Sequence, residues 1–230
     1  MTEIRRARFA VSVDALLQQW ARQEGAPAGT ALIASTEIAG RIRGGVEWRH
    51  DESVAVGVLA RPRALEPSEV ELGWLAAGLG AAAALDQVTG GHSVCLWPDR
   101  VVGTATDDRE HVDAVVSSAG HLGPGRVDDV VLIARVAGLA DVADGLGEAL
   151  VAELRSSARL LDEPTGLVEQ YRHRCATLGR RVSMTLLPHG TTRGLARDVS
   201  LEGALLVESP TGLTEPIPVA TLGRLETLDG

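Results

Sequence analysis

The pattern of apolar residues changes near residue 179, and this change constrains the fold of the chain more than any other feature. Before residue 179, short apolar runs alternate with longer segments of helical periodicity. After it, alternating runs of strand type lie at 182–187, 194–199, 204–208, 215–219 and 224–227. Strands this short, separated by Pro and Gly, are typical of a β-barrel or sandwich of about 50 residues. We therefore predict one domain at residues 1–178 and a small all-β domain at 179–230.

The first domain is expected to be α+β, with a mixed β-sheet covered by helices. Apolar runs of strand type lie at 29–34, 54–60, 93–97, 112–118 and 127–137, and a Gly-rich turn at 120–126 joins the last two as a hairpin. Segments of helical periodicity lie at 12–24, 67–87, 139–161 and 166–178. Ser12 is the expected N-cap of the first helix, Gly25 follows its end, and Pro164 separates the last two.

The composition excludes several classes of protein. With 230 residues and 45% hydrophobic content, the chain has enough apolar surface to bury a core. We predict no membrane span, because every apolar stretch of about 18 residues is interrupted by a charge or a Gly-rich break. Residues 1–6 lack the apolar core of a secretory signal, so we expect a cytoplasmic protein. A formal net charge of −9 argues against a nucleic-acid-binding surface.

The chain contains neither lysine nor asparagine, so all 22 of its basic residues are arginine. This excludes enzymes that need a Schiff-base lysine, a P-loop lysine or a lysine general base. A GC-rich genome gives the same bias, so the composition alone does not separate codon drift from lost function. Cys95 and Cys175 lie far apart, and no Cys/His group has the spacing of a zinc site. We expect two reduced buried thiols and no metal site.

Three short motifs carry a resemblance to a known family. Residues 193–199 (RGLARDV) and 202–208 (EGALLVE) are similar to the G-x-A-x-x-(I/V) and G-A-L-L-V-E runs of the small C-terminal domain of biotin protein ligases. Residues 39–48 (AGRIRGGVEW) resemble that family's A-G-R-G-R-x-G-R-x-W loop. Trp97 and Pro98 stand in the place of its K-W-P-N-D landmark. The chain therefore resembles the biotin protein ligase family, within the biotin/lipoate ligase superfamily, over nearly its whole length.

The resemblance implies a fold, ligands and partners. The fold would be the ligase domain followed by an SH3-like β domain. An active member would use ATP and Mg²⁺ to convert biotin to biotinyl-adenylate, and would then transfer the biotinyl group to a lysine of a carrier protein. A biotin-carrier or carboxylase protein is thus the implied partner, and a homodimer is compatible with the family. The chain has no winged-helix segment before residue 12, so we predict no transcriptional role.

The same resemblance marks a set of substrate-binding candidates. These are Gly40, Arg41, Arg43, Gly44, Gly45, Trp48 and Trp97. The guanidinium groups of Arg41 and Arg43 have the fork that clamps phosphate or carboxylate, and the alternative is a solvated loop or structural pairing. Trp48 and Trp97 either pack in the core or line a pocket. We assign no catalytic residue and no metal ligand.

The departures from the family motifs remove polar groups. Leu96 replaces the lysine of K-W-P-N-D, and residues 12–14 (SVD) replace Ser-Thr-Asn. The loop has Ile38, Ile42 and Val46 where the family has Gln, Gly and Arg, and residues 133–137 (IARVA) replace G-I-G-I-N. By analogy with deleted oxyanion-hole donors, loss of the lysine alone raises the barrier by about 3 kcal/mol.

Three hypotheses follow from this pattern. The first is a biotin protein ligase-like protein with a degenerate active site, which binds a ligand or partner without catalysis. The second is an active ATP-dependent ligase for biotin or a related acyl group, in which Arg100 or Arg135 replaces the lysine. That hypothesis requires one of these arginines to face the loop at 40–48. The third is a scaffold that uses the fold only to dock another protein.

Overall fold

The computed structural model describes residues 3–48, 53–104, 111–137 and 143–228. Seven strands form one sheet in the order β1-β2-β3-β7-β6-β5-β4. Their bounds are β1 Ile4–Ala10, β2 Ala31–Glu37, β3 Ser53–Ala60, β4 His92–Leu96, β5 Arg100–Thr104, β6 His111–Gly123 and β7 Arg126–Ala137. Only β1 and β2 pair in parallel, so the sheet is mixed, as predicted.

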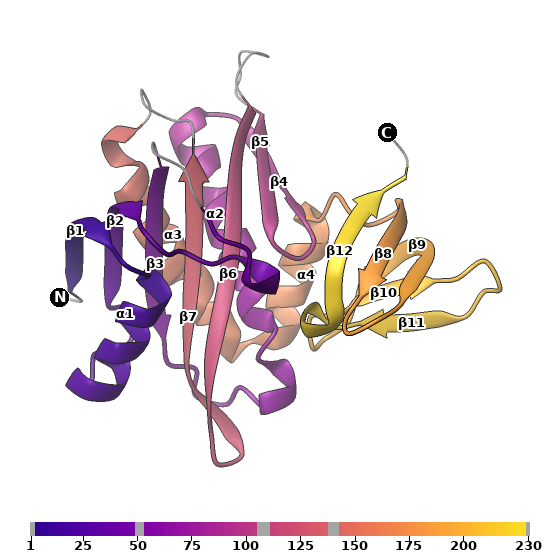
Figure 1. Ribbon diagram of the computed structural model, residues 1–230, viewed down its shortest axis with the longest axis horizontal. Coiled ribbons are helices and arrows are strands. Elements are labelled where there is room, and N and C mark those ends of the chain that lie inside the picture. The colour runs from indigo at the N-terminus through magenta and orange to yellow at the C-terminus, as the bar shows by residue number, and fades with distance from the viewer. Residues whose placement is uncertain (1–2, 49–52, 105–110, 138–142, 229–230) are drawn as a thin grey trace.

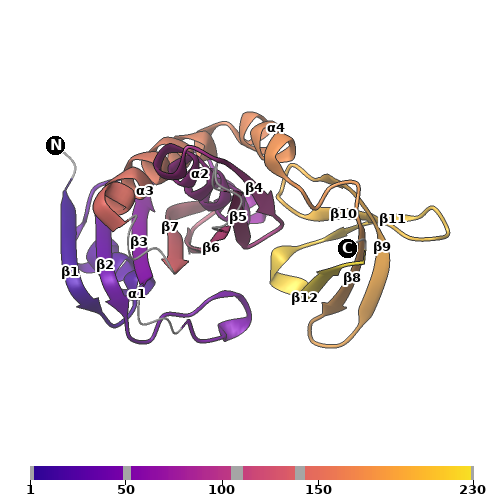
Figure 2. The ribbon, with the colours of Figure 1, turned by 90° about the horizontal axis from the view of Figure 1, so that it is seen from above.

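Helices cover both faces of this sheet (Figures 1 and 2). The α-helices are α1 Val13–Gln19, α2 Leu72–Thr89, α3 Ala143–Ala158 and α4 Pro164–Arg174. Helices α2, α3 and α4 lie on one face and α1 lies on the other (Figure 2). Helix α2 is buried around most of its circumference because small residues such as Gly78 and Gly80 let α4 and α3 approach it closely. Two hydrophobic clusters result, a large one around α2 and a smaller one under α1.

The first helix starts and stops where the sequence predicts. The Ser12 hydroxyl accepts a hydrogen bond from the Ala15 N–H, which caps the helix. The helix continues through a π-type turn at Trp20–Glu24 and ends at Gly25, whose φ of 64° is left-handed. Val13 and Leu17 are fully buried against the sheet, so the predicted apolar stripe is the packing face.

The C-terminal part is a second, antiparallel sheet beside α4 and β4 (Figure 1). Its strands follow the order β11-β10-β9-β8-β12. They are β8 Arg181–Leu186, β9 Thr191–Val199, β10 Leu205–Glu208, β11 Thr214–Ile217 and β12 Leu222–Thr227. All five predicted strands are confirmed, and with them the small β domain behind an α+β domain. The boundary at residues 178–179 stays a prediction.

The structure differs from the sequence prediction at three places. Strands β1 and β5 were not predicted: the arginines of β1 hide its apolar alternation, and β5 is only five residues long. The last helix covers Pro164–Arg174 rather than 166–178, because proline at the first helical position begins a helix instead of breaking it. Residues 139–142 of the predicted helix at 139–161 lie outside the described residues.

Polar contacts join the two sheets. The indole Nε1 of Trp97, just after β4, donates to the Gly203 carbonyl at 3.0 Å. The carboxylate of Glu71, before α2, accepts the Val219 and Ala220 N–H groups, each at 2.8 Å. The C-terminal sheet is therefore fixed to α2 and β4 through its own backbone. None of the helices in the described ranges combines the length and apolarity that crossing a bilayer requires.

Candidate functional site

The loop at residues 38–48 holds most of the predicted site residues and lies on the α1 side of the sheet. It leaves β2 and extends toward the C-terminal domain (Figure 2). Two hydrogen bonds close it: Ile42 N–H to the Val46 carbonyl and Trp48 N–H to the Gly40 carbonyl, both at 2.9 Å. The tip turns through Gly44 and Gly45, each with a φ of 73°, which only glycine adopts readily. The loop therefore has a defined conformation of its own.

Arg43 ties this loop to the rest of the molecule. Its Nε donates to Asp99 Oδ2 at 2.8 Å, and its Nη1 donates to the carbonyls of Leu222 and Gly223 at 2.6 and 2.9 Å. The side chains of Arg43 and Asp99 are only 15% and 16% exposed, so they form a largely desolvated pair. Because its charge is already neutralised, Arg43 acts here as a structural link between the loop, the segment after β4 and β12.

Arg41 is in a different situation. It is exposed, and its Nη1 donates to the Gly45 carbonyl of its own loop at 3.1 Å. No carboxylate in the described part of the chain forms an ion pair with it. Of the two loop arginines, Arg41 is therefore the one whose charge remains available to an anion.

The two tryptophans of the predicted site are buried. Trp48 and Trp97 are 7% and 2% exposed, and Trp97 is among the largest fully buried side chains. The Trp97 backbone N–H donates to Thr177 Oγ1, and its indole bonds to the C-terminal domain. Both contacts are structural, which matches the core-packing alternative for this residue.

A buried ion pair that the sequence analysis did not identify lies next to the loop. Arg135 of β7 and Glu37 of β2 have fully buried side chains, with 2.6 Å between Arg135 Nε and Glu37 Oε2. Arg135 Nη1 also donates to Ser117 Oγ on β6 at 2.7 Å, and Glu37 Oε1 accepts the Val13 N–H at 2.7 Å. This carboxylate thus occupies the N-terminus of α1, where backbone N–H groups and the helix dipole favour negative charge.

Gly40 is required by this pair. A Cβ built on Gly40 overlaps the Glu37 carboxylate, so only glycine fits beside it. The sequence gives one indication of the pair. Arg135 lies in an otherwise apolar run (VVLIARVA), and a charged side chain in a buried strand needs a partner of opposite charge. The partner is 98 residues away, and nothing in the sequence names it.

The pair joins three segments that the family resemblance marks. These are the start of the first helix, the strand end before the A-G-R motif, and the strand in the place of G-I-G-I-N. Protein atoms fill the space between them at this point, since both charged side chains have no exposed surface. Neither side chain is accessible to a ligand in this arrangement.

The other arginine considered as a lysine replacement is also paired. Arg100 of β5 forms an ion pair with Asp113 of β6, and both side chains are about half exposed. Leu96, at the position of the family lysine, is partly buried at the end of β4. Arg135 therefore lies beside Gly40 of the loop, but its guanidinium is bound to Glu37 and Ser117, and Arg100 is paired with Asp113.

Asp14 lies in the first turn of α1 and accepts a hydrogen bond from the Gln18 side chain at 2.6 Å. Burial raises the pKa of its carboxyl, and the Arg135 guanidinium offsets part of that effect. Within the described ranges, no group of three or more His, Cys, Asp or Glu side chains is arranged to hold a metal ion.

A cavity of about 420 Å³ lies where the loop meets the C-terminal domain. Arg43 and Gly44 line one side, and the remaining walls come mainly from Val70, Trp74, Leu187 and Leu222. Ser118 also lines it, but its hydroxyl is buried against Gly73 and has no hydrogen-bond partner in the described structure. The cavity is thus mostly apolar.

Comparison with known proteins identifies the fold. Residues 177–221 match the family model for the biotin protein ligase C-terminal domain. A biotin protein ligase from Aquifex aeolicus, solved with biotin and ATP, aligns with a TM-score of 0.70 and 19% identity, covering 99% of this chain and 100% of that one. No curated protein sequence matches this chain significantly.

Two further solved structures agree. The biotin acetyl coenzyme A carboxylase synthetase from Helicobacter pylori, with bound biotinylated ATP, has a TM-score of 0.60 and 13% identity over 94% of this chain and 100% of that one. The biotin protein ligase from Leishmania major, in complex with biotinyl-5-AMP, has a TM-score of 0.59 and 16% identity over 94% and 99%. This chain thus has the biotin protein ligase fold over nearly its whole length, and its residues 177–221 match the model of the biotin protein ligase C-terminal domain.

Proposed function

We propose that this chain is a non-catalytic relative of the biotin protein ligases, which binds a partner or ligand but does not transfer biotin. The observation that carries the proposal is the buried ion pair between Arg135 and Glu37. It fills the space between three segments that stand in the place of family motifs, one of which is the start of the loop with most of the substrate-binding candidates. A ligand would have to displace a fully desolvated salt bridge and leave two buried charges without partners, which is strongly unfavourable.

The charges near the loop support the same conclusion. Condensing a carboxylate with ATP brings several negative charges together, and positioned cations usually supply the largest stabilisation of such a transition state. Here Arg43 is neutralised by Asp99, Arg100 by Asp113 and Arg135 by Glu37. Leu96 contributes no charge. Of the two loop arginines, Arg41 alone keeps its charge available, so the residues that the structure describes fit a Mg²⁺-ATP complex poorly, and we derive no reaction step for it.

The surfaces near the loop support a binding role. Phe9, Val11 and Ile38 are 58%, 64% and 62% exposed at the adjoining ends of β1 and β2. The mostly apolar cavity beside Arg43 offers a second contact surface. Because the solved relatives include a carboxylase synthetase, we propose a biotin-carrier or carboxylase protein as the partner.

The alternative is an active ligase, which would attach biotin or a related acyl group to a carrier lysine. The full-length likeness to ligases solved with biotin and ATP favours it, and so does the available charge of Arg41. The two functions predict opposite results in one experiment. The purified chain is incubated with biotin, ATP, Mg²⁺ and a carboxylase carrier domain, and biotin transfer is read on a streptavidin blot.

The proposal expects no ATP-dependent signal, whereas the Aquifex aeolicus ligase labels the same carrier domain in a parallel reaction. A carrier variant whose target lysine is replaced by alanine controls for non-specific acylation. Labelling of the lysine-containing carrier alone, at a rate that rises with the concentration of this chain, would overturn the proposal. Calorimetric titration with the unbiotinylated carrier domain then tests the partner, and a null titration excludes it.

A further inference from the structure

A second pocket, far from the loop at 38–48, is lined by four arginines. It has a volume of about 340 Å³, and Arg61, Arg63, Arg155 and Arg159 line it together with one carboxylate, that of Asp162. The loop precedes β3 and this pocket follows it. An eight-residue strand is about 26 Å long, so the two sites lie at opposite ends of β3.

The local structure explains why these side chains converge. Arg61 and Arg63 follow β3 and are separated by Pro62, so the extended chain directs both to the same side. Arg155 and Arg159 are four residues apart at the end of α3, and therefore share one helix face. Like charges at this spacing destabilise an isolated helix. Folding then brings both pairs to one pocket in a chain whose net charge is −9.

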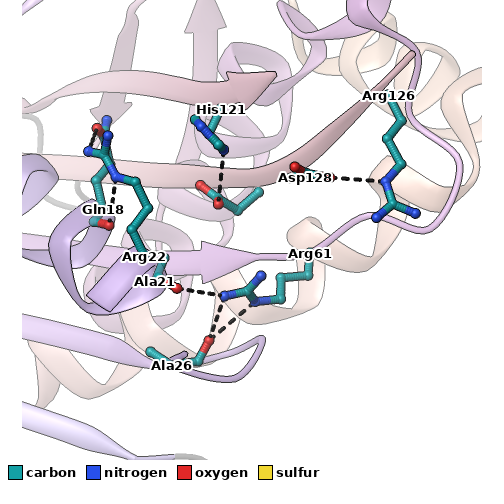
Figure 3. A network of polar contacts seen from close by, with 9 residues as sticks. Gln18, Ala21, Arg22, Ala26, Arg61, His121, Arg126 and Asp128 are labelled. Atoms are coloured by element: carbon teal, nitrogen blue, oxygen red, sulfur yellow. Dashed lines mark hydrogen bonds and ion pairs between the residues drawn. The ribbon is translucent and has the colours of Figure 1, made fainter. Parts of the chain in front are cut away.

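Two of the arginines are held by backbone carbonyls. Arg61 donates to the Ala21 carbonyl at 3.2 Å and twice to the Ala26 carbonyl, at 3.2 and 3.0 Å (Figure 3). Arg155 donates to the Gly29 carbonyl at 2.8 Å and to the Glu3 carbonyl at 3.3 Å. A carbonyl orients a guanidinium without cancelling its charge. Burial lowers the pKa of Arg155, and an anion bound beside its guanidinium would raise this pKa.

The other two arginines have no internal partner. Among the residues that the structure describes, none forms a hydrogen bond or ion pair with the side chain of Arg63 or Arg159. The single carboxylate in the pocket is already engaged, because Asp162 Oδ1 accepts the Arg63 backbone N–H at 2.7 Å. The pocket thus gathers four positive charges against one negative charge, with two guanidinium forks fixed in place and two free.

We propose that this pocket binds a small, multiply charged oxyanion of the phosphate or diphosphate class. Guanidinium groups donate paired hydrogen bonds to phosphate oxygens, and four of them surround a volume at the lower end of small-ligand sites. The proposal is independent of the function proposed for the other end of β3. It holds whether or not the chain transfers biotin.

Calorimetric titration with inorganic pyrophosphate at constant ionic strength tests the proposal. Saturable binding is expected, with chloride at matched ionic strength as the blank. Arg63→Gln and Arg159→Gln should each weaken the affinity roughly tenfold, because each removes charge-assisted hydrogen bonds. Neither side chain forms a hydrogen bond or ion pair within the described part of the chain, so the unliganded variants should melt like the parent protein.

Arg126→Gln is the matched control. Arg126 is also exposed, but it is paired with Asp128 on the β6–β7 hairpin (Figure 3) and does not line the pocket. Its variant should bind pyrophosphate with unchanged affinity. Absence of saturable binding to the parent protein would overturn the proposal, as would equal loss of affinity in Arg126→Gln and Arg63→Gln. Orthophosphate in a second titration should bind more weakly than pyrophosphate, since it presents fewer charges and oxygens to four arginines.

Discussion

At the scale of single residues, the pair of Arg135 and Glu37 depends on both of its members. Each charge is fully buried, and each makes an additional bond, from Arg135 to Ser117 and from the Val13 N–H to Glu37. A buried salt bridge adds little net stability over a well-packed apolar pair, but removing one partner leaves the other charge uncompensated. The site is therefore sensitive to single substitutions and tolerant of a matched double substitution.

Arg135→Met should lower the free energy of unfolding by about 3–5 kcal/mol, because Glu37 is left buried without its cation. Adding Glu37→Gln should recover a large part of this loss, since glutamine keeps an oxygen for the Val13 N–H and carries no charge. Urea denaturation measures both variants. Arg100→Gln is the control, because its pair with Asp113 is half exposed and contributes about 1 kcal/mol or less. Similar small losses in Arg135→Met and Arg100→Gln would contradict the role given to the buried pair.

At the scale of secondary-structure elements, sequence patterns predict those strands and helices whose formation depends on residues close together in the chain. The five C-terminal strands were predicted because each shows its own alternation and turn residues. Strand β1 was missed since its arginines belong to an exposed sheet edge, where charge is common. The loop at 38–48 was found by its motif. Its anchoring through Arg43 was not, because Asp99 is 56 residues away and becomes a partner only in the folded chain.

Gly40→Ala should destabilise the junction between β2 and this loop. The added methyl group overlaps the Glu37 carboxylate, which cannot move without leaving Arg135, so we expect a loss of about 1–3 kcal/mol. In a Glu37→Ala background the same change should cost less, because the space is then free. A double-mutant cycle in urea measures this coupling, and strictly additive losses would refute it. Gly166→Ala in α4 is the control, since a Cβ there meets no close atom.

At the scale of the whole molecule, the two sheets are joined by a few polar contacts around α2 and β4. Glu71 makes two of them through the Val219 and Ala220 N–H groups, and Trp97 makes a third with Gly203. Arg43 adds contacts to Leu222 and Gly223 from the loop. These contacts end on backbone groups of the C-terminal domain, whereas Arg172 of α4 forms an ion pair with the Asp198 side chain of β9, and apolar side chains of both domains share one hydrophobic cluster.

Glu71→Ala should loosen the C-terminal domain without unfolding either sheet. Loss of the carboxylate leaves the partly buried Val219 N–H without an acceptor, which costs about 1–3 kcal/mol, whereas the exposed Ala220 N–H can bond to water. Arg180 lies in the segment between α4 and β8, and Arg181 is the first residue of β8, so limited trypsin digestion should cleave there faster than in the parent protein. Glu202→Ala serves as the control, because Glu202 is an exposed acid of the C-terminal domain whose side chain forms no hydrogen bond or ion pair with the residues that the structure describes. Equal cleavage rates in the two variants would contradict the role given to Glu71 and leave the domain held by its other contacts, whereas faster cleavage only in Glu71→Ala would support that role.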